Sequence, residues 1–212
     1  MKNPASLENL NQKTWDEHYQ KEKARQKYPD ENLVRMLGNL RRGAALDFGC
    51  GSGRHIALLH ELGFSPIYGT DISQNAVEMC RKDYAYAGLF KSNLPSSEEF
   101  LLPFPDEYFD LIVAWGVLHY NGRSSLETIL EEFKRILKNG ATFVGTLRST
   151  NDTHFVSNPD MEGSEILYFT EEEAKELIGA HFHDVQLGYM ERIPLGENRK
   201  VCHWCFRAKN IC

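Results

Sequence analysis

Three glycines fall within five residues of the sequence, directly after a short apolar run that ends in an acid. The stretch ALDFGCGSGRH (44–54) places Asp47 ahead of Gly49, Gly51 and Gly53. Glycines at this density indicate a turn whose backbone a ligand can approach closely, because no side chain covers it. The carboxylate beside the turn attracts a positively charged group, an interaction of several kcal/mol at about 4 Å and intermediate dielectric.

The spacing of the glycines argues against a dinucleotide site. That fingerprint reads G-x-G-x-x-G, and its third glycine would fall where this chain has Arg54. A pyrophosphate would also bring negative charge towards Asp47. Asp71 ends the next apolar run, a position where an acid can accept both hydroxyls of a ribose. The two acids and the turn therefore predict a nucleoside with a cationic amino-acid-like tail and no phosphate, a description that S-adenosyl-L-methionine fits.

The elements that must position these residues alternate between strand and helix patterns. Apolar runs predict five strands, at 44–49, 65–71, 88–93, 108–116 and 141–147. Helical patterns lie between or before them, at 31–40, 53–63, from the cap Ser73 to about 83, and at 126–137 with Lys138–Gly140 ending the last. A capping box of Thr170 and Glu173 begins a helix at 171–179, and strands at 184–192 and 199–208 should pair antiparallel. This order predicts an α/β fold with a doubly wound, mostly parallel seven-stranded sheet, helices on both faces and an antiparallel C-terminal hairpin.

The chain reads as one domain with four parts. We expect an N-terminal helical cap at 1–42, a cofactor-binding core at 43–147, and a C-terminal helix and hairpin at 170–212. The irregular stretch at 148–169 is a candidate lid or substrate loop, because structureless loops of that length in compact domains are often functional.

Composition narrows the partners and the location. The net charge of −6 disfavours a nucleic-acid surface, since such domains usually carry a basic face. The longest apolar stretch, LIVAWGVL (111–118), is too short to span a bilayer. The polar first twenty residues lack a secretory apolar region, and five cysteines, an odd number, fit a reducing compartment. We expect a cytoplasmic protein that does not bind membranes, and the sequence indicates no oligomeric state.

The sequence CHWC (202–205) is the one spacing that suggests a metal or redox site. It lies within a strand pattern, where residues i and i+3 point to opposite faces. No second Cys/His pair of matching spacing accompanies it. We therefore expect these cysteines to be structural and expect no metal.

Taken together, the motifs resemble those of the class I S-adenosylmethionine-dependent methyltransferases. LDFGCGSGRH resembles the family's first motif, GTDIS the acidic end of its second strand, and LPFPDEYFDLIVAWGVLHY (102–120) the run through its fourth. The resemblance implies that the cofactor contacts Asp47, Gly49, Cys50, Gly51, Gly53, Asp71, Ile72 and Trp115. It also places Asn93 and Leu94 where the family often has an acid that binds adenine, although here an amide takes that place.

The sequence says less about the residues that would contact the methyl acceptor. The stretch TWDEHYQ (14–20) resembles the N-terminal cap of small-molecule members, and Trp15 and Tyr19 share a helix face. That face either docks on the core or closes over the cofactor, and a sulfonium–aromatic contact favours the second role for Tyr19. His119 is the candidate general base, with Tyr120 beside it and His154 as a second candidate for the substrate side; a structural histidine is the alternative.

We expect a methyltransferase that moves a methyl group from S-adenosyl-L-methionine to a small-molecule acceptor by in-line displacement. Two alternatives stay open. One is a non-catalytic or regulatory module that binds the same cofactor, and the other is a methyltransferase acting on protein or nucleic acid. The acceptor and its nucleophilic atom are not encoded in any motif of the sequence.

Overall fold

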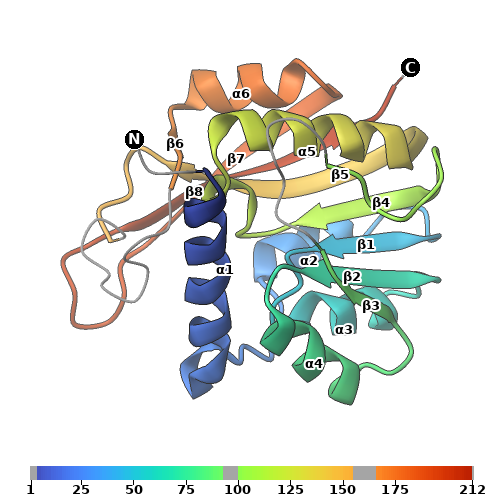
Figure 1. Ribbon diagram of the computed structural model, residues 1–212. Coiled ribbons are helices and arrows are strands. Elements are labelled where there is room, and N and C mark those ends of the chain that lie inside the picture. The colour runs from blue at the N-terminus through green and yellow to red at the C-terminus, as the bar shows by residue number, and fades with distance from the viewer. Residues whose placement is uncertain (1–3, 93–99, 155–165, 212) are drawn as a thin grey trace.

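The computed structural model describes residues 4–92, 100–154 and 166–211, and its centre is a mixed β-sheet (Figure 1). The strands run in the order β3-β2-β1-β4-β5-β8-β7, with β6 paired to β5 off this path. Their bounds are β1 (Ala45–Phe48), β2 (Ile67–Asp71), β3 (Gly88–Lys91), β4 (Phe109–Ala114), β5 (Leu137–Ser149), β6 (Tyr168–Phe169), β7 (His183–Arg192) and β8 (Val201–Lys209). Strands β1 to β6 pair in parallel, whereas β8 runs antiparallel to both β5 and β7. The predicted sheet and C-terminal hairpin are confirmed, and the two-residue β6 adds an eighth strand.

Helices cover both faces of this sheet (Figure 1). They are α1 (Pro4–Gln20), α2 (Glu31–Leu37), α3 (Arg54–Glu61), α4 (Gln74–Asp83), α5 (Arg123–Ile136) and α6 (Glu171–Gly179), with short 3₁₀ turns η1 (Glu22–Ala24) and η2 (Leu118–Tyr120). Side chains of α5 and α6 form one apolar core with one face of the sheet, and those of α2, α3 and α4 form a second core with the other. Strand β4 serves both, since Ile112 lies in the first core and Val113 in the second. Its unbroken apolar run is thus explained by burial on both faces.

Helix starts follow the capping signals of the sequence. The Ser73 hydroxyl accepts a hydrogen bond from the Ala76 N–H at 3.2 Å, which begins α4. At α6 the predicted capping box is present, with Thr170 and Glu173 bonding each other's backbone N–H.

The predicted boundary between α5 and β5 was wrong, because the helix was expected to end at residue 137 and the strand to begin at residue 141. Helix α5 ends at Ile136, and residues 137–140 already belong to β5, where Leu137 pairs with Phe109. Lys138 forms an ion pair with Asp110 at 2.6 Å instead of capping the helix. Gly140, with φ of 75°, lies where the register between β4 and β5 shifts.

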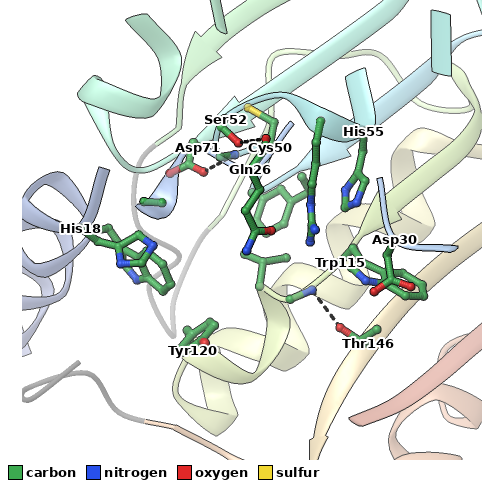
Figure 2. Close-up of a pocket in the computed structure, with 18 of the residues that line it drawn as sticks. His18, Gln26, Asp30, Cys50, Ser52, His55, Asp71, Trp115, Tyr120 and Thr146 are labelled. Atoms are coloured by element: carbon green, nitrogen blue, oxygen red, sulfur yellow. Dashed lines mark hydrogen bonds between the residues drawn. The ribbon is translucent and has the colours of Figure 1, made fainter. Parts of the chain in front are cut away.

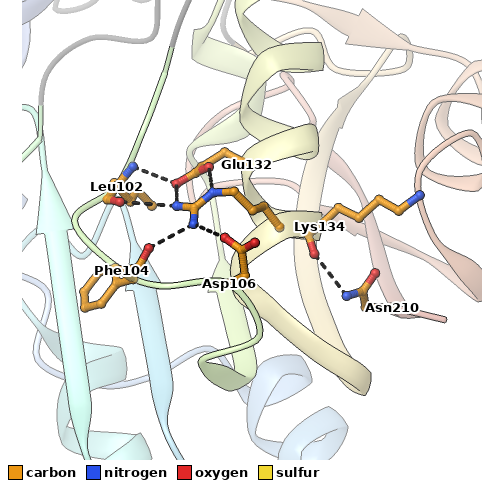
Figure 3. A network of polar contacts seen from close by, with 7 residues as sticks. Leu102, Phe104, Asp106, Glu132, Lys134 and Asn210 are labelled. Carbon is orange, nitrogen blue, oxygen red and sulfur yellow. Dashed lines mark hydrogen bonds and ion pairs between the residues drawn. The ribbon is translucent and has the colours of Figure 1, made fainter. Parts of the chain in front are cut away.

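The segment that leads into β4 is fixed to α5 by a polar network (Figure 3). The Arg135 guanidinium forms hydrogen bonds with Glu132, with Asp106 at 2.6 Å and with the Phe104 carbonyl at 3.0 Å. The buried Glu132 carboxylate also accepts from the Leu102 N–H at 2.7 Å. Because its charge is paired and hydrogen-bonded, Glu132 can be buried beside the first core.

Three further predictions concern a metal site, a membrane-spanning helix and the candidate lid. The CHWC stretch lies in β8, and among the described residues no group of His, Cys, Asp and Glu has the arrangement of a metal site. None of the helices in the described ranges is long and apolar enough to cross a membrane. Most of the candidate lid, 155–165, lies outside the described residues.

Candidate functional site

A cavity of about 500 Å³, here called the central cavity, opens at the carboxyl ends of β1, β2 and β4. Crevices at this edge of an open α/β sheet are where such folds bind ligands. In Figure 2, Asp71 and Cys50 lie on one side of the cavity and Asp30, Trp115 and Thr146 on the other. Helix α1, the following residues and the β7–β8 hairpin supply the remaining walls.

The glycine turn after β1 forms part of the cavity wall. The N–H groups of Gly49 and Cys50 both donate to the Thr70 carbonyl, at 2.8 and 3.0 Å, so the turn is fixed to the end of β2. Gly49 and Gly51 have φ of 72° and 53°, which other residues rarely adopt. A Cβ atom at Gly49 would lie 2.5 Å from the Val117 Cγ2 atom. Glycine is therefore required by both the backbone conformation and the lack of space.

Asp71, at the end of β2, lies on the cavity wall with both carboxylate oxygens fixed. Oδ2 accepts from the Gly51 N–H and Oδ1 from the Ser73 N–H, each at 2.9 Å. Burial raises the pKa of Asp71 to about 6, and the two backbone N–H donors oppose that rise. Each oxygen keeps acceptor capacity, so a pair of hydroxyl groups could bond to it.

Asp47 lies behind the glycine turn, completely buried, and is not among the described residues on the cavity wall. Neither of its oxygens has a hydrogen-bond partner among the residues that the structure describes. Burial raises its pKa to about 7, which the positive charge of Arg54 partly opposes. His55 Nδ1 lies 3.9 Å from Oδ1, but burial lowers the His55 pKa to about 3, so the imidazole is neutral. A buried carboxyl without a partner is costly unless a ligand compensates it.

Helix α1 presents an aromatic face to the cavity. Trp15, His18 and Tyr19 all line it, and the Trp15 and Tyr19 ring centroids lie 6.1 Å apart. The Tyr120 ring of η2 meets Trp15 edge-on at 4.8 Å. The Tyr19 hydroxyl lies where a Cβ atom at Gly51 would be only 2.5 Å away, so the tyrosine rests directly on the glycine turn.

Polar contacts fix this helix over the site. The Asp16 carboxylate accepts from the Ser73 hydroxyl at 2.7 Å, and the Asp16 carbonyl accepts from the Asn75 amide at 3.0 Å. Farther along the chain, the Ser52 hydroxyl donates to the Gln26 carbonyl at 2.7 Å. The N-terminal segment therefore contacts both the start of α4 and the glycine turn.

The other residues predicted to contact the cofactor lie in three different places. The cavity wall includes Cys50, Ile72 and Trp115. Gly53 is the N-cap of α3, with φ of 83°. Asn93 and Leu94 lie outside the described residues, so their predicted adenine contact stays a prediction.

Of the residues predicted to lie on the acceptor side, some line the cavity and others do not. Tyr120 lines the cavity, whereas His119 is completely buried and is not among its described lining residues. Burial, together with the nearby His203 and the positive charge of Arg148, holds the pKa of His119 well below its usual range. His154 lies 3.5 Å from a Glu197 oxygen and is likewise not on the described wall.

Sequence reasoning missed four residues on one part of the cavity wall, here called the far wall. Arg54, the first residue of α3, lines the cavity together with Asp30, Arg192 and His203. Arg54 follows the glycine motif directly, a signal that could have indicated it. Arg192 and His203 carried no such signal, because which face of a hairpin turns inward depends on its register.

Comparisons with known proteins agree with this geometry. Residues 46–145 match the family model described as a methyltransferase domain. The chain is 35% identical to the mitochondrial arginine-hydroxylase NDUFAF5 of Rattus norvegicus over 103 residues, which are 49% of this chain and 28% of that protein. It is 29% identical to demethylmenaquinone methyltransferase of Geobacillus kaustophilus over 117 residues, 54% of this chain and 49% of the relative. The chain thus spans less than half the length of these curated relatives.

The fold also matches solved structures. One is 1,6-didemethyltoxoflavin-N1-methyltransferase of Burkholderia thailandensis, with bound 1,6-didemethyltoxoflavin and S-adenosylhomocysteine. The TM-score is 0.71 over 100% of this chain and 92% of that one, at 17% identity. Fold and site define the architecture of the class I S-adenosylmethionine-dependent methyltransferases. The part of the chain that matches the methyltransferase-domain model, residues 46–145, runs from β1 into β5.

Proposed function

We propose that this protein transfers a methyl group from S-adenosylmethionine to a small-molecule acceptor. The observation that carries the proposal is the pairing of two buried acids around one glycine turn: Asp71 on the cavity wall and Asp47 behind it, with no partner among the described residues. This acid-flanked turn suits an adenosine with a cationic tail, and ionised acids beside it would repel a pyrophosphate.

The residues fit the parts of the cofactor. Asp71 would accept the ribose hydroxyls, and Ile72 beside it would contact adenine. Asp47 would compensate the ammonium group, and the bare backbone at Gly49 and Gly51 would allow the methionine part to approach. When bound, the cofactor supplies a methyl group that its sulfonium already activates.

The chain's own contribution is then alignment in a water-poor cavity. Holding a nucleophile in line with a methyl group can supply several kcal/mol of the barrier. Trp15 and Tyr19 of α1 line the cavity and would shield a bound cofactor from water. Burial raises the pKa of Tyr120, so its hydroxyl serves as a hydrogen-bond donor rather than as a base. The position of His119 behind the wall gives no support to direct proton abstraction by its ring.

Two features support a small acceptor. The cavity is covered by α1 and the hairpin, and the net charge of −6 offers no general attraction to nucleic acid. Two of the similar proteins are named for small-molecule acceptors, demethylmenaquinone and 1,6-didemethyltoxoflavin. A cytoplasmic location stays a prediction.

Calorimetry with S-adenosylhomocysteine and S-adenosylmethionine tests the cofactor half of the proposal. We expect both to bind, and no binding by either at millimolar concentration would refute it. A screen of metabolites with methyl-labelled cofactor then tests the acceptor half by mass, since methylation adds one CH₂ unit and hydroxylation adds one oxygen. Label transferred only to protein or nucleic acid would contradict a small-molecule acceptor. Binding without transfer to any acceptor would identify a non-catalytic module.

A further inference from the structure

We propose that the methyl acceptor carries a carboxylate group, held on the far wall of the central cavity by Arg54, Arg192 and His203. The inference rests on the proposed methyl transfer and names the chemical class of the acceptor. It is carried by one juxtaposition: two arginines and one imidazole N–H line the same cavity with no partner for these donor groups among the described residues.

The β7–β8 hairpin turns one of its faces into the cavity. Met190 pairs with His203 and Arg192 with Val201, and residues two apart on a strand share a face. All four of these side chains line the cavity. The hairpin therefore supplies an apolar surface that carries one cation and one imidazole.

The tautomer of His203 follows from its neighbour. Arg148 Nη1 lies 2.9 Å from His203 Nε2, and because a guanidinium can only donate, Nε2 must accept. Arg148 is itself held by Asp152, with Nε 2.9 Å from Oδ2. Burial and the Arg148 charge lower the pKa of His203 to about 4, so the ring is neutral and its proton is on Nδ1. His203 thus presents an N–H donor at Nδ1, and its basic nitrogen, Nε2, is already occupied by Arg148.

Arg54 contributes a second guanidinium to this wall, from the start of α3. In the described ranges, its side chain has no hydrogen bond or ion pair, although it is partly buried. Burial lowers its pKa, while Asp30, Asp47 and Tyr19 raise it, and an arginine stays protonated. A planar guanidinium of this kind binds a carboxylate through two parallel hydrogen bonds.

Two of the acids near this wall have partners of their own. The Asp30 carboxylate caps α2, accepting from the Asn32 N–H at 2.9 Å. Glu191 forms an ion pair with Lys200 at 2.9 Å. Neither acid lies within ion-pair distance of Arg54 or Arg192 among the described contacts. The unmatched donors on this wall therefore favour a negatively charged group on the acceptor.

The test uses protein saturated with S-adenosylhomocysteine and matched pairs of probes, each a carboxylic acid and its primary amide: benzoate with benzamide, nicotinate with nicotinamide, and butanoate with butanamide. Calorimetry should show at least one carboxylate binding tenfold or more tightly than its amide. Arg192→Gln and Arg54→Gln should each reduce that carboxylate's affinity tenfold or more and leave the amide unchanged. Arg199→Gln, on the same hairpin but not on the described cavity wall, is the matched control and should change neither.

Several results would overturn the inference. One is that no carboxylate binds better than its amide. A second is that Arg54→Gln and Arg192→Gln leave the preference intact. A third is that Arg54→Gln weakens S-adenosylhomocysteine alone, which would show that Arg54 holds the cofactor's own carboxylate. Failure of S-adenosylhomocysteine to bind the unsubstituted protein would refute the proposed function instead, so the two failures are distinguishable.

Discussion

Asp47 is the residue on which the account of the cofactor site most depends. Its carboxyl is buried and lacks a hydrogen-bond partner among the described residues, and its pKa is raised to about 7 by that burial. The free protein therefore carries a partly protonated acid near neutral pH, and a bound cation would favour the ionised form. Sequence alone placed this acid correctly beside the turn, because the motif is local and its strand is short and apolar.

The pH dependence of cofactor binding follows from the two raised pKa values. As the pH falls through 7, Asp47 takes up a proton, and Asp71 does so near 6. Because the ligand favours the ionised acids, affinity for S-adenosylhomocysteine is full above pH 7 and falls towards about pH 5.5. In Asp47→Asn the step near 7 should vanish while the step near 6 remains. Calorimetry across this range measures both, and equal affinity throughout for the unsubstituted protein would contradict the assignment.

Asp71 offers the simplest substitution test at this scale. Asp71→Asn removes the negative charge and one of two acceptor oxygens, so affinity for S-adenosylhomocysteine should fall tenfold or more, about 1.4 kcal/mol. The exposed Asp83 at the end of α4 provides the control, since Asp83→Asn leaves the cavity untouched. Circular dichroism must show both variants folded. Unchanged binding by a folded Asp71→Asn protein would remove Asp71 from the site.

At the scale of elements, we expect helix α1 to determine how firmly the cofactor is enclosed. Its aromatic face covers the glycine turn, and the Asp16 contacts to Ser73 and Asn75 fix it to α4. The sequence predicted the shared face of Trp15 and Tyr19 from their spacing. It could not predict which of two roles that face has, because docking on a core and covering a ligand use the same aromatic pattern.

We expect Asp16→Ala to weaken S-adenosylhomocysteine binding about three- to tenfold, the loss of one or two hydrogen bonds. The loss should appear mainly as faster dissociation, because a loosened cover opens more often. Stopped-flow displacement measures that rate. Glu17→Ala, on the exposed side of the same helix, should dissociate at the unsubstituted rate. Equal rates for Asp16→Ala and Glu17→Ala would show that α1 does not retain the cofactor.

The β7–β8 hairpin has features that the sequence could predict and others that it could not. Alternation indicated two paired strands, and the capping box indicated the helix before them, because both signals are local. The side chains that the hairpin turns inward, Arg192 and His203, depend on pairing register and on the position of β8 beside β5. Those are long-range features, so no sequence signal indicated that His203 lies on the cavity wall.

At the scale of the whole molecule, the cavity joins segments that are far apart in the sequence. The glycine turn and Asp71 face it from the parallel half of the sheet, while Arg192 and His203 face it from the antiparallel half. Under the proposed function, the half with the glycine turn and Asp71 would hold the cofactor, and the half with Arg192 and His203 would hold the acceptor. A transfer reaction requires two such sides around one point of contact.

The most direct measurement of the central claim is a crystal structure of the protein with S-adenosylhomocysteine. In that complex we expect ribose hydroxyls within hydrogen-bond distance of Asp71, the amino group directed to the Asp47 side of the glycine turn, and the sulfur turned towards Trp115 and Thr146. S-adenosylhomocysteine bound in the opposite orientation, with its ribose against the β7–β8 hairpin, would contradict the proposed cofactor site.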